Sequence, residues 1–369
     1  MSNYFDNFYD WWKNIDKFLF FLILGLFFLG LFFSLVSTSL IASDKLDTKS
    51  YYFFLKHSVY IGLAIIILII FSIINQKILA KFSIVLFSIA FLTLFLVPFF
   101  GIEVKGSKRW LDLYFLPRFQ PVEILKPFFI VILSLMLTIQ NRRLYFKYFL
   151  TTLLLFPILM LLAYQPDIGQ TLLLILVWLA LIFVSGINIY IFFIFFLFVG
   201  TFVSYLVLFI PKFEYIKIRL LAFLDTSSGN NYQAEKASDA IINGGFFGKG
   251  IGEGTLNTRV PEAHTDYIVS VISEEFGAII VISILFLYLI FSYKVLQKVN
   301  FIGEDLSRLI LIGCVTLILL QTFIHVGVNI RLLPTTGMTL PFLSYGGSSI
   351  VSTAILSGII LNLTKRKLD

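Results

Sequence analysis

The chain has 369 residues, of which 59% are hydrophobic and 13% are charged, and its mean hydropathy is +0.96. A soluble domain carries about a quarter charged residues, so this composition excludes a soluble globular protein and predicts a polytopic membrane protein. The net charge of +7 comes from basic residues dispersed over short connections, a pattern that reports topology and contact with anionic membrane lipids. Since no basic segment is interleaved with aromatic residues, we expect no nucleic-acid partner.

Ten apolar segments qualify as membrane spans, because about 20 apolar residues cross the hydrocarbon layer of a bilayer. They are residues 18–36, 57–75, 82–100, 121–140, 147–164, 168–186, 189–210, 266–293, 307–329 and 343–363. The first is interpreted as a true span, since no small-residue cleavage site follows it. The sequence therefore predicts an all-α polytopic membrane protein of about ten transmembrane helices, forming one domain over residues 1–369.

The connections between spans predict the topology. Residues 75–81, 140–147 and 364–367 contain Lys or Arg but no acidic residue, so the positive-inside rule places them in the cytoplasm together with both termini. The long segment 211–265, between the seventh and eighth spans, then lies outside the cell. It is far longer than the usual connection between bundled helices, which favours a functional role for this extracytoplasmic loop.

Charged residues near span ends are candidate site residues, because burying them in a membrane is costly without a purpose. In residues 106–127, Glu123 and Lys126 lie three apart on one helix face and are expected to form an ion pair within the helix. The alternative is a cationic pocket in which Arg118 and Lys126 bind the diphosphate of a lipid-linked substrate. Arg109 is a further candidate for binding the diphosphate, and Gln120 is a supporting candidate.

Two further polar segments are expected on the outer side of the membrane. In QPDIGQ, residues 165–170, Asp167 either caps the sixth helix or supports the site. Residues 232–254 contain six glycines between Gly244 and Gly254, but match neither a Walker A loop nor a dinucleotide fingerprint. We expect these glycines to let the backbone approach a ligand or turn tightly against the membrane. Lys249, within this segment, is another candidate for binding the diphosphate.

The last acidic segment, VPEAHTDYIVSVISEEFG, covers residues 260–277. Asp266 is expected at the outer mouth of the eighth span, where it either caps the helix with Thr265 or takes part in chemistry. Glu274 follows eight residues later, about 12 Å deeper in a continuous helix, and is expected to brace the bundle. Glu262 and His264 are supporting candidates. The spacing of His, Cys and carboxylate residues predicts no zinc site.

With these segments, the chain closely resembles the SEDS family (shape, elongation, division and sporulation), whose members are FtsW, RodA and SpoVE. The resemblance runs from about residue 100 to the C-terminus and is carried by KGSKRWLDL, FQPVEILKP, QPDIGQ, NYQAEKASDAIINGGFFGKGIGEG, VPEAHTDYIVSVISEEFG and LPTTGMTLPFLSYGGSSI. PEAHTD and LPTTGMTLPFLSYGGSS look more like the division member than the elongation member. Val122 and Gln170 depart from the usual QPSE and QPDxGT patterns, but neither departure changes a charged position.

The resemblance implies an enzyme that polymerises lipid II, the undecaprenyl-diphosphate-linked disaccharide-pentapeptide, into glycan strands. It implies a site at the outer face of the bacterial cytoplasmic (inner) membrane, at the division septum. The implied partners are a class B penicillin-binding protein and other divisome proteins. The family's essential acidic residue maps onto Asp266 and its basic residues map onto Arg118 and Lys126. Ser344, in the last segment, is a further supporting candidate.

The implied reaction converts an α-linked donor into a β-linked product, and such an inversion needs one displacement and one carboxylate as general base. Asp266 takes this role in our hypothesis. Because an aspartate is a weak base for an alcohol, we expect help from partial burial or from a divalent cation, Mg²⁺ or Mn²⁺, and we expect no organic cofactor. The alternatives are a lipid II transporter and a non-catalytic divisome scaffold. Against a transporter, the charges cluster at the outer mouth and no inverted repeat is seen.

Overall fold

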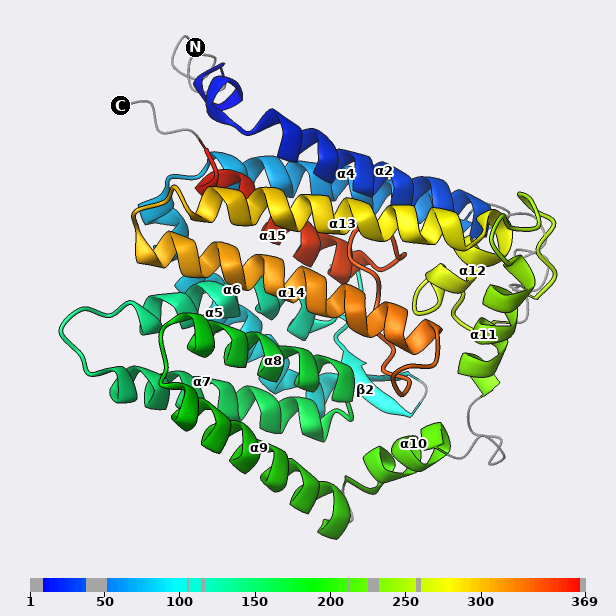
Figure 1. Cartoon of the computed structure of the whole chain (residues 1–369). Helices are drawn as coiled ribbons and strands as arrows, with labels where there is room; N and C mark the ends of the chain where they lie inside the picture. The colour runs from blue at the N-terminus through cyan, green and yellow to red at the C-terminus, as the bar shows by residue number, and fades with distance from the viewer. Residues whose placement is uncertain are drawn as a thin grey trace.

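The computed structural model describes residues 9–37, 52–104, 106–113, 117–210, 213–224, 232–256 and 260–365, and these are mostly helical (Figure 1). Each of the ten predicted spans coincides with or overlaps a long helix. These helices are α2 (Lys17–Ser37), α4 (Tyr52–Ile73), α5 (Gln76–Phe100), α6 (Pro121–Leu137), α7 (Leu144–Tyr164), α8 (Ile168–Val184), α9 (Ile189–Phe209), α13 (Ala278–Val299), α14 (Asp305–Asn329) and α15 (Gly347–Leu363).

Length and composition identify the helices that can cross a membrane. Within the described part of the chain, six are long and apolar enough, namely α2, α4, α5, α7, α13 and α14. Shorter apolar helices follow in α8, α9 and α15. The predicted all-α, polytopic membrane fold is therefore confirmed.

The long helices form a bundle with two distinct ends (Figure 1). At one end α2 begins and α15 finishes. At the other end lies a two-stranded antiparallel hairpin of β1 (Ile102–Val104) and β2 (Ser107–Trp110). The short helices α10 (Glu214–Leu224), α11 (Tyr232–Gly244) and α12 (Ile268–Phe276) gather there too (Figure 1). We call this second end the hairpin end, and the candidate site residues lie at it.

The centre of the bundle consists of α6, α8, α14 and α15. Most side chains of α6 and α15 are buried, whereas α9 lies at the periphery of the bundle (Figure 1). Small residues allow close packing, and a Cβ added at Gly358 of α15 would lie only 2.8 Å from the Leu68 carbonyl oxygen of α4. Nearby, the Asn362 amide donates to the carbonyls of Phe71 and Ser72 at the end of α4, which have no partner within their own helix.

The prediction of one continuous span over residues 266–293 was wrong. The segment forms two helices, α12 and α13, separated at Gly277, which has a φ of 85°. This left-handed region favours glycine, and an added Cβ at Gly277 would lie 2.2 Å from the Phe246 carbonyl oxygen. Residues 268–275 of α12 are all buried inside the protein. Their apolar composition therefore reflects burial at the hairpin end, and composition alone does not distinguish this from burial in lipid.

The predicted outer loop, residues 211–265, is also more ordered than a long connection. In its described parts, α10 and α11 account for most of the residues. Residues 211–212, 225–231 and 257–259 of the predicted loop lie outside the described residues. The loop thus contributes two helices to the hairpin end.

Candidate active site

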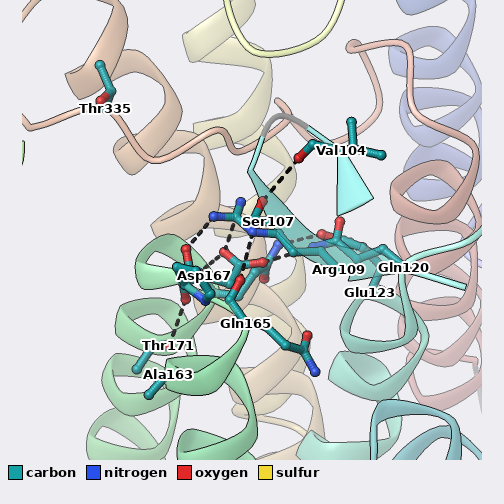
Figure 2. Close-up of polar contacts among 12 residues, drawn as sticks. Val104, Ser107, Arg109, Gln120, Glu123, Ala163, Gln165, Asp167, Thr171 and Thr335 are labelled. Carbon is teal, nitrogen blue, oxygen red and sulfur yellow. Dashed lines mark hydrogen bonds and ion pairs between the residues drawn. The ribbon is translucent and has the colours of Figure 1, made fainter. Parts of the chain in front are cut away.

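A buried group of polar side chains surrounds Asp167 at the start of α8 (Figure 2). The Asp167 carboxylate caps this helix by accepting a bond from the Gln170 N–H at 3.4 Å, and it accepts a second bond from Gln120 Nε2 at 2.9 Å. A guanidinium nitrogen of Arg109 lies 3.8 Å from the same carboxylate. Burial raises the pKa of Asp167, and the Arg109 charge opposes that shift.

Arg109 is fixed in this place by its other contacts. Its guanidinium also donates to the backbone carbonyls of Gln165 and Pro166, the two residues before Asp167 (Figure 2). Because Arg109 belongs to β2, these bonds fasten the hairpin to the start of α8. The arginine is therefore committed to protein contacts on several sides.

The same polar contacts continue into the bundle through α6. The Gln170 amide donates to Glu123 Oε1 at 2.6 Å, and Lys126 Nζ lies 2.8 Å from Glu123 Oε2. Lys126 Nζ also donates to Gln321 Oε1 on α14 at 3.0 Å. Glu123 and Lys126 are 4% and 0% exposed, so the ion pair within the helix lies inside the protein. We call the connected set the buried polar chain, and its members are Arg109, Gln120, Glu123, Lys126, Asp167, Gln170 and Gln321.

Arg118 has very different surroundings from Lys126. Its side chain is 64% exposed and its Nε lies 3.0 Å from Asp112 Oδ2. Within the described residues no contact joins Arg118 to Lys126. The two cations therefore do not form the shared pocket that the sequence suggested as an alternative, because the amine of Lys126 is turned toward Glu123 and Gln321 inside the bundle.

Asp266 lies in a turn just before α12, which we call the Asp266 turn (residues 261–267). Its N–H donates to the Glu262 carbonyl at 3.1 Å, and its own carbonyl accepts from Asn329 Nδ2 at the end of α14 at 3.2 Å. The residue is part-buried, and a Cβ added at Gly337 would lie 3.4 Å from its carboxylate oxygen Oδ2. The N-cap of α12 is Tyr267, so Asp266 does not cap this helix.

Three of the supporting candidates hold the Asp266 turn. Glu262 has a φ of 55°, and its carboxylate accepts from Thr265 Oγ1 at 3.0 Å. Ser344 is buried and donates through Oγ to the Thr265 carbonyl at 2.7 Å. The His264 carbonyl accepts from the Tyr345 N–H at 3.0 Å. The Asp266 turn is thus fastened to the segment that precedes α15.

Residues 335–339 connect the buried polar chain with the Asp266 turn, and we call them the connecting segment. The Thr339 carbonyl accepts from Gln321 Nε2 at 2.9 Å, which joins the segment to the chain. Gly169 of α8 packs so closely that an added Cβ would lie 2.9 Å from the side chains of this segment. Gly337, in its middle, lies beside the Asp266 carboxylate. Two regions that are far apart in sequence therefore meet along five residues.

The sequence reasoning missed Arg219, which lies on α10. One of its guanidinium nitrogens donates to the Thr335 carbonyl at 3.4 Å. Burial lowers the pKa of Arg219, the Arg109 charge lowers it further, and Asp167 opposes the shift. Little signal for this residue was present in the sequence, since α10 also contains Glu214 and Lys217 and resembles an ordinary surface helix.

The glycine-rich segment packs against α12. The Glu274 carboxylate accepts from Asn243 Nδ2 at 2.8 Å and from the Leu256 N–H at 2.9 Å, so it braces this segment from within. A Cβ added at Gly248 would lie 2.2 Å from the Glu275 carbonyl oxygen. The close backbone contact with α12 explains Gly244 and Gly248, and the side chain of Lys249 is exposed.

The divalent cation expected to help Asp266 stays a prediction, because Mg²⁺ is usually held by one or two carboxylates together with substrate phosphates. Among the described residues, no group of three or more His, Cys, Asp or Glu side chains is placed to hold a metal ion. Asp266 is one carboxylate, and Mg²⁺ requires near-octahedral oxygen coordination from protein, water and substrate. The steps derived below therefore use only groups of the chain itself.

Comparison with known proteins places the chain in a family. The family model described as "Cell cycle protein", which covers FtsW, RodA and SpoVE, matches residues 17–368. The chain belongs to this family. It is 30% identical over 362 residues to the "Probable peptidoglycan glycosyltransferase FtsW" of Caulobacter vibrioides, covering 97% of this chain and 91% of that protein.

Solved structures give the same result for the fold. The chain matches a component of a peptidoglycan synthase complex that was studied for the coordination of polymerization and crosslinking, with a TM-score of 0.77 and 26% identity. That match covers 95% of this chain and 97% of the other. The rod shape determining protein RodA of Thermus thermophilus matches with a TM-score of 0.68 and 26% identity, covering 95% and 96%.

Proposed function

We propose that this protein is a peptidoglycan glycosyltransferase that polymerises lipid II at the outer face of the bacterial cytoplasmic membrane during cell division. Its family and the names of its relatives support this activity. The observation that carries the proposal is the part-buried carboxylate of Asp266, held on a braced turn at the hairpin end. The match to a peptidoglycan synthase complex supports a class B penicillin-binding protein as partner.

The proposed topology places the hairpin end outside the cell and both termini in the cytoplasm. The start of α2 and the end of α15 lie together at the opposite end of the bundle, which supports this orientation (Figure 1). Substrate carried on an undecaprenyl tail in the outer leaflet then meets Asp266 at the membrane surface. Septal location follows from the division role.

The chemistry assigned to Asp266 is proton removal. A sugar hydroxyl of one lipid II attacks the anomeric carbon of the growing chain, the new glycosidic bond forms, and undecaprenyl diphosphate leaves with inversion. Asp266 accepts the hydroxyl proton as general base. Its N–H donates to the Glu262 carbonyl and its carbonyl accepts from the Asn329 side-chain amide, and these bonds fix its position for an oriented attack.

The leaving diphosphate needs cations near it, because negative charge grows on it in the transition state. Arg118 and Lys249 are exposed cations at the hairpin end and are proposed to attract the diphosphate. Arg109 and Lys126 are bound within the buried polar chain, and we assign them to positioning α6 and α8. The exposed cations are thus assigned to the substrate, and the cations enclosed by protein partners are assigned to positioning helices.

The test is gel-resolved polymerisation of labelled lipid II by the purified protein with its cognate penicillin-binding partner. We expect Asp266→Asn to lower the rate at least about 100-fold, the usual contribution of a general base. The matched control is Asp239→Asn, since Asp239 is a half-exposed carboxylate on α11 that pairs with Lys236. Equal rates for wild type and Asp266→Asn would remove Asp266 from the mechanism. No polymer from wild type, together with lipid II flipping in liposomes, would establish the transporter instead.

A further inference from the structure

We propose that Arg219 on α10 binds the diphosphate of the lipid-linked sugar donor. The proposal rests on the function proposed above and adds a residue that neither the sequence motifs nor the relatives' names assign. It starts from the balance of charge around α10. The charges of Arg109, which has the same sign, and of Asp167 both act on the Arg219 guanidinium. The Asp167 carboxylate already pairs with Arg109, and among the described residues no ion pair involves Arg219, so an anionic ligand suits this guanidinium.

The hydrogen-bonding capacity of the two arginines differs. Arg109 uses its guanidinium on the carbonyls of Gln165 and Pro166 and on the Asp167 carboxylate. Within the described residues, the Arg219 guanidinium makes one long bond of 3.4 Å, to the Thr335 carbonyl. A guanidinium carries five N–H donors in a planar fork that matches two phosphate oxygens. Of the two arginines, Arg219 therefore has more guanidinium N–H donors left for a ligand.

The position of Arg219 fits a leaving group opposite Asp266. Arg219 contacts Thr335, and the Asp266 carboxylate lies beside Gly337, two residues further along the connecting segment. Two residues span at most about 7 Å. The charges of both Asp266 and Arg219 act on the Tyr267 hydroxyl, which is consistent with both groups lying near it. A base and a diphosphate site that contact the same short segment suit a single displacement at a carbon held between them.

The alternative is that Arg219 only fastens α10 to the bundle through Thr335. The two roles differ in what they recognise. A fastening role depends on one carbonyl acceptor, whereas a diphosphate site depends on the number of phosphate groups in the ligand. Lys217 provides the control, because it is an exposed cation on the same helix and two residues away.

The experiment measures inhibition of lipid II polymerisation by undecaprenyl diphosphate and by undecaprenyl monophosphate, using the complex with the penicillin-binding partner. We expect Arg219→Gln to raise the KM for lipid II and to weaken inhibition by the diphosphate about 10- to 100-fold, the range for lost hydrogen bonds to a charged group. Inhibition by the monophosphate should weaken less. Lys217→Gln should leave both values unchanged, and Arg219→Lys should recover part of the loss because it keeps the charge without the fork.

Unchanged KM and unchanged diphosphate inhibition in Arg219→Gln would overturn the proposal and leave Arg219 a fastening role. If Arg219→Gln unfolds at a lower temperature than wild type, Arg219→Lys decides, and wild-type inhibition in that variant would also overturn the proposal. Direct binding of undecaprenyl diphosphate to Asp266→Asn, with and without Arg219→Gln, needs no polymerisation. Equal binding by these two proteins contradicts the Arg219 site alone, whereas absence of polymer from wild type contradicts the proposed function alone.

Discussion

The buried polar chain and the Asp266 turn both bring carboxylates to the hairpin end, but they hold them differently. In the chain, Glu123 and Asp167 are at most 4% exposed and are bonded to side chains from neighbouring elements. In the turn, the backbone of Asp266 is fixed while its side chain is part-buried. A carboxylate enclosed by protein partners positions helices, whereas the carboxylate of Asp266, carried on a braced turn, is the one that we propose acts on the substrate. The degree of burial therefore distinguishes a positioning carboxylate from a proposed catalytic one, although both are acidic residues.

The largest effect on stability that this comparison predicts is at Lys126. Lys126→Met leaves the buried Glu123 without its cation and should lower the free energy of unfolding by about 3–5 kcal/mol. Denaturant titration of the purified protein in detergent measures the loss. The double variant Lys126→Met/Glu123→Gln removes both buried charges and should recover most of the stability. If the double variant were as unstable as the single one, the ion pair would not be what Lys126 contributes.

A smaller effect is expected in the Asp266 turn, at Ser344. Ser344→Ala removes a donor to the Thr265 carbonyl and an acceptor for the Leu340 N–H, and should cost about 1–3 kcal/mol. Because Asp266 follows Thr265 directly, kcat should fall more than KM changes. Steady-state polymerisation and thermal unfolding measure the two effects.

The control for Ser344 is Ser283→Ala on α13, an exposed serine that bonds only within its own helix. It should change the free energy of unfolding by less than about 0.5 kcal/mol. A Ser344→Ala protein with wild-type kcat would show that the turn does not need this brace to position Asp266.

The smallest expected effect is a pH dependence from Asp167. Burial raises its pKa above the ordinary value of 3.8 in the folded protein, so its neutral form contributes stability below pH 3.8, and this contribution is lost as pH rises through the raised pKa. Asp167→Asn keeps a helix cap and removes the ionisation. Its unfolding temperature should therefore fall less than that of wild type between pH 3.8 and neutrality. If the unfolding temperatures of the two proteins changed with pH in parallel, ionisation of Asp167 would not be the source of the pH dependence.

The sequence predicted the long helices well because membrane helices require long apolar runs, and those runs are visible in composition. It failed where apolar residues are buried by protein, as in α12, whose end depends on the conformation of Gly277. The hairpin of β1 and β2 was also missed, because its strands are too short to show a pattern.

In the candidate site, too, contacts within one segment were predictable from the sequence and contacts between distant segments were not. The Glu123–Lys126 pair and the cap at Asp167 follow from spacings of three residues along the chain. Burial of Lys126 depends on Gln321, which lies 195 positions later, and the position of Arg219 depends on Thr335, 116 positions later. Contacts over such separations are set by helix packing, and the spacing of residues within one segment does not encode them.

The connecting segment accepts hydrogen bonds from neighbouring helices through its main-chain carbonyls. The carbonyls of Thr335, Met338 and Thr339 accept from Arg219, His325 and Gln321 in turn. An alanine scan across these positions would leave all three carbonyl acceptors in place and would report only the side-chain contacts, such as the bond between the Thr339 and Ser349 hydroxyls. Changes to the path of the main chain, such as a one-residue insertion, would instead shift the acceptors away from α10 and α14 together. Substitutions within the segment therefore leave these three bonds to α10 and α14 in place, whereas a change in the length of the segment would disturb all three together.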